Sequence, residues 1–342
     1  DFLKFIHIAD VHWGARPERE QTFGRIREQE IKETFQRVID HANKQQVDLL
    51  LIAGDLFDQP PTQQELREVD YLLSRLNHTR TVLIAGNHDH LEPHDVFSQY
   101  KWNSEVYLLD GKQRDHISFE DLETTIYGFS YWKNQITKPL YDRMKPDESE
   151  SSDFSILLAH GGDESHIPIQ REALKWSGFD YIALGHIHKP MKVGSELYRY
   201  CGTPLACSVS EAQQQKGIIM VEMGVKGEVK TTILPLEPLR QVKVVKGTLE
   251  EVLKESCKDY VTVILTDKAD LDVIDMQERI RLAFPNLLEI RRENQRKTDY
   301  TRTLQTEELL DPYELCCSFL KDLDEEEKMI LQDVLHTVQG VK

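Results

Sequence analysis

Five apolar segments of the chain each end in a short polar motif that contains Asp, Asn or His, and this pattern constrains the fold most strongly. The clearest example is Val47–Ala53, which is apolar except for Asp48 and leads directly into Gly54-Asp55. An apolar run of this length that ends at a glycine is typical of a buried parallel strand. Ligands of open α/β sheets bind at the carboxyl ends of such strands. The pattern therefore predicts one functional site that several strand ends build together.

The other four motifs also follow apolar segments. They are Asp10-Val11-His12, Gly86-Asn87-His88-Asp89-His90, His160-Gly161-Gly162 and Gly185-His186-Ile187-His188. The first three apolar segments alternate with two stretches, residues 25–45 and 62–76, whose apolar side chains recur with helical period. This alternation predicts a mostly parallel sheet with helices on both faces. We expect all five motifs at one edge of a single sheet, with Asp10 and His12 on the same side of an extended segment.

The strand-end motifs combine two carboxylates, one amide oxygen and several imidazoles, with no thiolate. The set is Asp10, His12, Asp55, Asn87, His88, His160, His186 and His188. Mixed nitrogen and oxygen ligands suit Mn²⁺, Fe²⁺ or Zn²⁺ better than Mg²⁺ or Ca²⁺. The residues are too many for one cation and sufficient for two if one carboxylate bridges, and two cations ~3.5–4 Å apart form the clamp used in phosphoester hydrolysis. A single histidine on an apolar strand is more often structural, and we assign that role to His7, His41, His78, His116 and His336.

The bulk properties bound the class of protein. A chain of 342 residues is long enough for about two domains. Its net charge of −17 disfavours a general electrostatic grip on nucleic acid. Five cysteines without a C-x-x-C pair indicate reduced thiols in an intracellular protein. No apolar run approaches the ~20 residues of a membrane span and no signal peptide is visible, so we expect a cytoplasmic protein.

The second half of the chain changes character at Pro235 and Pro238. We expect a catalytic domain over residues 1–236, a small α/β capping domain over 240–293, and a basic linker with C-terminal helices over 294–342. Amphipathic patterns predict helices at Tyr313–Leu320 and Met329–Val338, which either pack on the small domain or bind a partner. The one notable basic cluster is a candidate nucleic-acid contact or a solvated linker, and it contains Arg291, Arg292, Arg296, Lys297 and Arg302.

The ordered series D-x-H, G-D-x-x-D, G-N-H-D, H-G and G-H-x-H resembles the calcineurin-like metallophosphoesterase family over residues 3–235. The segment Tyr127-Gly128-Phe129-Ser130, the small second domain and the helical tail are similar to its DNA-repair exonuclease branch, which includes the bacterial SbcD nuclease subunit and YhaO-like relatives. The resemblance implies an α/β protein with a four-layer α/β/β/α core of mixed sheets. It also implies two divalent metal ions, with Mn²⁺ expected first and Fe²⁺ or Zn²⁺ as alternatives.

The resemblance also implies a role for each motif residue. Asp10, His12 and His188 would hold the first metal, Asn87, His160 and His186 the second, and Asp55 would bridge them. A hydroxide between the metals would attack phosphorus. His88 would face the substrate and protonate the leaving oxygen, with Asp58 orienting it. Asp58 departs from the His that archaeal and eukaryotic nucleases of this branch carry, so the substrate class follows less directly than the metal site.

Three functions are compatible with these features. The first is a DNA exonuclease or endonuclease subunit that works in a DNA-repair complex with an SMC-like coiled-coil ATPase, with a homodimer as an option and no membrane contact. The second is a stand-alone phosphatase or cyclic-nucleotide phosphodiesterase, which fits the acidic charge but leaves residues 240–342 without a task. The third is a scaffold with structural metals, and the presence of His88 argues against it because a structural site does not need that residue.

Overall fold

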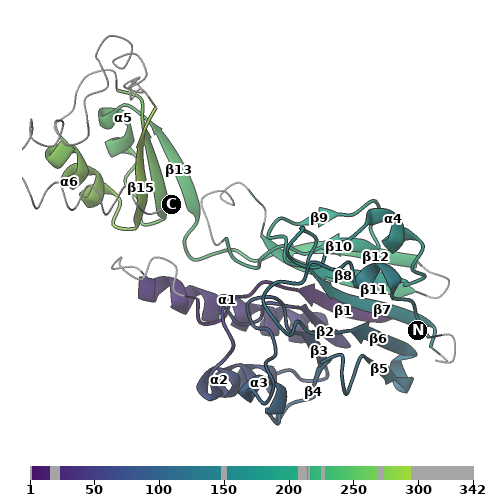
Figure 1. Ribbon diagram of the computed structural model, residues 1–342. Coiled ribbons are helices and arrows are strands. Elements are labelled where there is room, and N and C mark those ends of the chain that lie inside the picture. Colours follow the sequence, from purple (N-terminus) through teal and green to yellow (C-terminus); the bar gives the residue numbers. More distant parts are fainter. Residues whose placement is uncertain are drawn as a thin grey trace, which may run out of the picture.

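Two six-stranded mixed sheets stack to form the main body of the protein, and a three-stranded sheet forms a separate small unit (Figure 1). The computed structural model describes residues 2–15, 24–147, 152–206, 214, 216–224, 228–267 and 273–293. None of the helices within these residues is long and apolar enough to cross a membrane.

The first sheet has the strand order β12-β11-β1-β2-β3-β4. Its parallel part consists of β1 (Leu3–Ile8), β2 (Leu49–Ala53), β3 (Arg80–Ile84) and β4 (Val106–Leu108). The antiparallel strands β11 (Gly217–Gly224) and β12 (Glu228–Pro235) extend it beyond β1. Three helices cover its outer face: α1 (Gly24–Gln45), α2 (Gln63–Leu73) and α3 (Val96–Gln99) (Figure 1). The predicted capping box begins α2, since the Thr62 hydroxyl accepts the Glu65 N–H and the Glu65 carboxylate accepts the Thr62 N–H.

The second sheet has the strand order β5-β6-β7-β8-β10-β9. Its members are β5 (His116–Phe119), β6 (Thr124–Gly128), β7 (Phe154–His160), β8 (Tyr181–Gly185), β9 (Met191–Lys192) and β10 (Tyr198–Tyr200). Strands β6, β7, β8 and β10 run parallel, whereas β5 and β9 pair antiparallel at the two edges. The short helices η2 (Tyr141–Arg143) and α4 (Arg171–Lys175) cover the outer face, whereas η1 (Glu120–Leu122) forms the β5–β6 turn.

The alternation of side chains along β2 explains why the two sheets stack. Leu49 and Leu51 point into the core between the sheets, where they cluster with Ile156 of β7. Leu50 and Ile52 point the other way and cluster with the side chains of the covering helices. Both faces are fully buried, so the strand is apolar throughout and not alternating. The expected four-layer α/β/β/α class is confirmed.

The expectation of a single sheet is wrong. The motifs that contain Asp10, Asp55 and Asn87 follow β1, β2 and β3 of the first sheet, whereas His160 ends β7 and His186 follows β8 of the second. Strands that are buried on both faces give continuous apolar runs, and such runs carry no signal that tells one sheet from another. The motifs nevertheless converge, because the parallel strands of both sheets bring their carboxyl ends to the same end of the stack.

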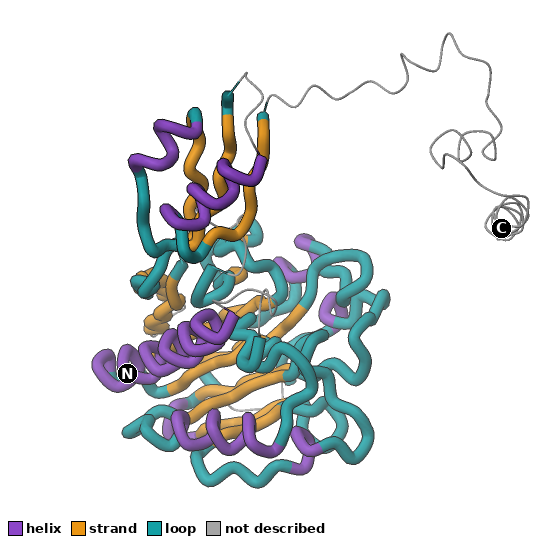
Figure 2. Tube along the Cα trace, turned by 90° about the vertical axis from the view of Figure 1, so that its left-hand side faces the viewer, coloured by secondary structure: helices purple, strands orange, loops and turns teal. Residues whose placement is uncertain are grey.

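The small unit is a parallel three-stranded sheet of β13 (Val242–Gly247), β14 (Tyr260–Leu265) and β15 (Leu287–Arg292), packed against α5 (Leu249–Lys254) and α6 (Val273–Ala283). Figure 2 shows it beyond α1 of the main body. Buried Glu30 of α1 joins the two parts: its carboxylate accepts hydrogen bonds from Arg240 at 2.6 Å and from the Tyr260 hydroxyl at 2.9 Å. The guanidinium of Arg27 lies over the Tyr260 ring.

Only two residues of the basic cluster, Arg291 and Arg292, lie within the described residues. Arg291 and Arg292 belong to β15 and not to a linker, and the Arg291 guanidinium forms an ion pair with Glu289 at 2.7 Å. Residues Arg296, Lys297 and Arg302 lie outside the described residues, as do both expected C-terminal helices, Tyr313–Leu320 and Met329–Val338.

Candidate metal centre

The backbone that carries the first two motifs is left-handed, not extended. Asp10, His12 and Asp55 have φ angles of +54°, +52° and +51°. Non-glycine residues adopt this region only where the surrounding structure holds them, and such strain is concentrated at functional sites. Here main-chain hydrogen bonds hold it: the Asp10 N–H donates to Gly54 and the His12 N–H donates to Asp55, both at 3.1 Å. The predicted extended D-x-H segment is therefore wrong, yet both side chains still reach the same site.

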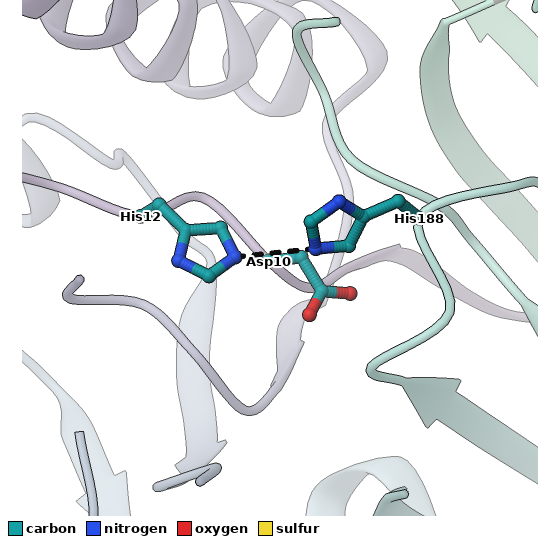
Figure 3. Close-up of side chains that lie close together, drawn as sticks. All are labelled: Asp10, His12 and His188. Carbon is teal, nitrogen blue, oxygen red and sulfur yellow. Dashed lines mark hydrogen bonds between the residues drawn. The ribbon is translucent and has the colours of Figure 1, made fainter. Parts of the chain in front are cut away.

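The first cluster contains Asp10, His12 and His188, whose ligand-type atoms lie within 4.8 Å of one another (Figure 3). The Nε2 atoms of His12 and His188 face each other at 3.4 Å. The Asp10 carboxylate is buried and accepts the backbone N–H of His186, which ties the ends of β1 and β8 together. These are the three residues predicted to hold the first metal.

The second cluster contains Asp55, Asn87, His160 and His186. The Asn87 side-chain oxygen lies 3.0 Å from His160 Nε2 and 3.1 Å from His186 Nδ1. The Asp55 carboxylate lies 3.3 Å from His160 Nε2, and its other oxygen accepts the N–H of His88 at 2.9 Å. Asp55 also groups with His12 and with Asp10, so it lies between the two clusters as a bridging ligand would.

The electrostatics of the site favour positive charge. Burial opposes a charge on His160, but the carboxylates of Asp55 and Asp10 outweigh it and raise the pKa of His160 to about 9. Burial likewise opposes a charge on Asp55, yet the neighbouring His160, His12 and His88 hold its pKa well below the ordinary value. The pKa of His12 is raised, because Asp58, Asp55 and Asp10 outweigh its burial.

The donor atoms fit a cation. His160 Nδ1 donates to the carbonyl of Ala53 at 2.8 Å, so Nε2 of the neutral ring presents a lone pair to the oxygens of Asp55 and Asn87. A lone pair that faces two acceptor oxygens requires a proton or a metal ion between them. Gly86 keeps this space open, because a Cβ there would lie 2.2 Å from the Asp55 carboxylate and 2.7 Å from His160 Nε2.

His88 lies beside the clusters at the surface of the site, within reach of His12 and Asp55. Its Nδ1 lies 3.0 Å from the main-chain carbonyl of Asp58, whereas the Asp58 carboxylate is 3.8 Å away. The same carboxylate lies closer to His12 Nδ1, at 3.3 Å. Asp58 therefore contacts His88 mainly through its backbone and contacts a predicted metal ligand through its side chain.

Three residues around the site were not singled out from the sequence. The Asp163 carboxylate accepts His186 Nε2–H at 2.6 Å and lies 2.9 Å from His166 Nδ1. Asp89 is fully buried and accepts the N–H groups of Gly86 and Phe57; burial, with Asp55 nearby, raises its pKa to about 7. The Tyr131 hydroxyl donates to the carbonyl of His160 at 2.9 Å. The single acid of the G-N-H-D motif was a signal for Asp89, whereas nothing in the local sequence marks the other two.

Comparisons with known proteins identify the families to which the two parts of the chain are similar. The model of the calcineurin-like phosphoesterase family matches residues 3–190, and that of the Type 5 capsule protein repressor C-terminal domain matches residues 236–323. The SbcD subunit of the nuclease SbcCD from Staphylococcus epidermidis is 25% identical over 322 residues, which cover 84% of each chain.

Two further relatives match a shorter stretch. The uncharacterized metallophosphoesterase YhaO of Bacillus subtilis is 32% identical over 57% of this chain and 50% of its own length. The DNA double-strand break repair protein Mre11 of Sulfurisphaera tokodaii is 33% identical over 54% of this chain and 49% of its own length. The alignments thus span about half the length of these two relatives. The first family model covers more than half of this chain, and the chain therefore belongs to the calcineurin-like phosphoesterase family of metal-dependent phosphoesterases.

Proposed function

We propose that this protein is a metal-dependent DNA nuclease that uses two divalent cations, with Mn²⁺ as the physiological metal. The observation that carries the proposal is the pair of clusters joined by Asp55, with His88 beside them at the surface. Bound cations would supply Lewis-acid stabilisation of the phosphoryl oxygens and activate water at neutral pH. DNA is favoured as the substrate because the SbcD relative is a nuclease by name and the Mre11 relative is a DNA double-strand break repair protein by name.

This proposal assigns a role to each residue of the metal centre. Asp10, His12 and His188 would hold one cation, Asn87, His160 and His186 would hold the other, and Asp55 would contribute to both sites. The Asp58 carbonyl accepts the Nδ1–H of His88. In its protonated form the ring would then present Nε2–H to the phosphate and give that proton to the leaving oxygen. The Asp58 carboxylate orients His12, as carboxylates commonly orient metal-bound histidines.

Asp163 fixes the orientation of His186. Because its carboxylate accepts the Nε2–H, the lone pair of the ring lies on Nδ1, which is the atom that faces Asn87. Burial also lowers the pKa of His186, which favours the neutral ring that can bind a cation.

The second half of the chain is proposed to dock a partner. We assign residues 1–236 to the nuclease domain, 240–293 to the capping domain and 294–342 to a linker and partner-binding segment. The start of the second family match at residue 236 supports this division. The proposed partner is an SMC-like coiled-coil ATPase, and the complex works on cytoplasmic DNA as a homodimer. Further nucleic-acid contacts are assigned to Arg291, Arg292, Arg296 and Lys297.

One assay tests the substrate class. End-labelled DNA and p-nitrophenyl phosphate esters are incubated with the metal-stripped protein after addition of Mn²⁺, Mg²⁺ or chelator. The proposal predicts that DNA is shortened with Mn²⁺ and remains intact with chelator. Rapid hydrolysis of a phosphomonoester together with intact DNA would favour a stand-alone phosphatase instead.

A further inference from the structure

A cavity of about 890 Å³ lies next to the second metal cluster and has no part in the metal chemistry described above. Segments that follow β3 and β6 form two of its walls, and the turn before β5 and the η2 region close it. The lining residues used below are Leu91, Glu92, Asp110, Lys112, Phe129 and Trp132. Its volume falls within the range of ligand pockets, ~300–1,000 Å³, and exceeds what one ordered water needs.

Tyr131 lies between the cavity and the metal centre and contacts both. It lines the cavity, its hydroxyl donates to the carbonyl of His160, and its ring lies edge-on to the His160 ring at 5.6 Å. Its main chain accepts the N–H of Leu91 at 2.8 Å and donates to Ala85 at 3.0 Å. The cavity is therefore held rigidly against the predicted ligand His160.

The lining offers aromatic faces to a planar ring. Trp132 is 46% exposed, although it is a large apolar side chain that folding ordinarily buries. Phe129 lies between it and Tyr141: its ring stacks on Tyr141 at 4.6 Å and lies 6.4 Å from Trp132. Exposed aromatic rings of this kind stack on nucleobases in proteins that hold single strands.

The charges of the cavity disfavour a phosphate as the occupant. Three carboxylates, Glu92, Asp110 and Asp115, line it against one ammonium group, Lys112. The Asp110 carboxylate is held in place by the backbone N–H groups of residues 112–114 and stays ionised, since these hydrogen bonds outweigh burial and lower its pKa. Anionic walls repel phosphate but accept hydrogen bonds from exocyclic amino groups.

We propose that this cavity binds one nucleobase of the DNA strand, next to the phosphodiester that the metals engage. The inference rests on the proposed nuclease function and adds a base-binding subsite to it. Trp132 stacks on the base, the carboxylates accept its amino groups, and Tyr131 sets the distance between the base and the cleaved bond. The enzyme thereby requires an unpaired nucleotide at this position.

The test compares Trp132→Ala with wild type on three substrates: an end-labelled single-stranded oligonucleotide, the same strand with abasic sites, and bis-p-nitrophenyl phosphate. Loss of one stacked base lowers kcat/KM on the intact strand roughly 5- to 140-fold, from a stacking energy of about 1–3 kcal/mol. Hydrolysis of the small diester is unchanged, and the abasic strand is cut equally slowly by both proteins. Trp132→Phe keeps a ring and restores most of the activity.

Trp176→Ala is the matched control, because Trp176 is 74% exposed after α4 and does not line the cavity. It has no effect on any substrate. Equal cleavage of intact and abasic strands by the wild type overturns the subsite while leaving the nuclease proposal intact. A loss of diester hydrolysis in Trp132→Ala also overturns it, because Trp132 then supports the metal centre itself.

A binding measurement tests the subsite without relying on nuclease activity. Adenosine is titrated into metal-free protein while tryptophan fluorescence is recorded, with inorganic phosphate as the comparison. Quenching by adenosine that is lost in Trp132→Phe, with no response to phosphate, supports the subsite even if no DNA is cut. Identical titration curves for wild type and Trp132→Phe overturn the subsite.

Discussion

Replacement of Asp163 tests whether a residue outside the metal clusters sets the affinity of the second metal site. Its carboxylate accepts the Nε2–H of His186 at 2.6 Å and so directs Nδ1 of that ring toward Asn87. Asp163→Ala removes the acceptor, and the ring is then free to change tautomer or rotate. Asp163→Asn keeps an acceptor oxygen but removes the charge.

The structure allows an estimate of the size of the effect. Loss of the partner that orients a metal-binding histidine typically costs 10- to 100-fold in metal affinity. The Asp163 side chain is 53% exposed, so solvent screens its charge and water can replace part of its contact. We therefore expect about a tenfold loss of affinity in Asp163→Ala, at the low end of that range, and a smaller loss in Asp163→Asn.

Isothermal titration of Mn²⁺ into metal-stripped protein measures this directly. The weaker of the two binding steps shifts in the Asp163 variants, while the number of bound cations stays the same. Asp121→Asn is the control: that carboxylate is 60% exposed and paired with Arg80 at 2.7 Å, away from the site. Unchanged Mn²⁺ affinity in Asp163→Ala would show that His186 is oriented by other contacts.

Three further predictions follow from separate features. His88→Ala keeps about two bound metals by metal analysis but loses turnover by a factor of roughly 10²–10⁴, the contribution of a positioned acid; loss of metal would make His88 a ligand. Burial lowers the pKa of His7 to about 3, so only the unfolded chain takes up its proton below pH ~6.5, and stability is lost as the pH falls. Urea unfolding should show that the free energy of unfolding of wild type is lower at pH 5.0 than at pH 7.5 by about 2 kcal/mol from His7. This contribution should be absent in His7→Gln. Deletion of residues 306–342 should leave hydrolysis of a small diester intact and abolish co-purification with the ATPase; unchanged partner binding in a pull-down would place the interface elsewhere.

The strand ends were predictable because an apolar run and the polar candidate ligand after it lie next to each other in the sequence. The apolar run of β2 marks a buried strand, and Asp55 immediately after it marks a polar strand end, so both the element and the candidate ligand follow from adjacent residues. The capping box at Thr62 was equally local. Short edge strands such as β5 and β9 were not predicted, since tertiary pairing decides them and local pattern does not.

The parts of the site that depend on distant contacts could not be predicted. Asp163 approaches His186 only because the loop after β7 folds back toward the loop after β8, and an exposed acidic residue in a polar loop has no distinctive pattern. The left-handed conformations of Asp10 and His12 arise from hydrogen bonds to the neighbouring β2 loop and not from their own preferences. Tyr131 is similar, because its role depends on a carbonyl of another strand.

The bridging role of Asp55 is the central claim, and metal stoichiometry tests it most directly. Wild-type protein and Asp55→Asn are reconstituted with Mn²⁺, freed of excess metal and measured by mass spectrometry of the bound manganese. An amide offers one neutral oxygen, so it should hold two cations far less well than the two anionic oxygens of the proposed Asp55 bridge. The account predicts two manganese equivalents per wild-type chain and clearly fewer in the variant, with a similar circular dichroism spectrum. Two equivalents and normal turnover in Asp55→Asn would contradict it.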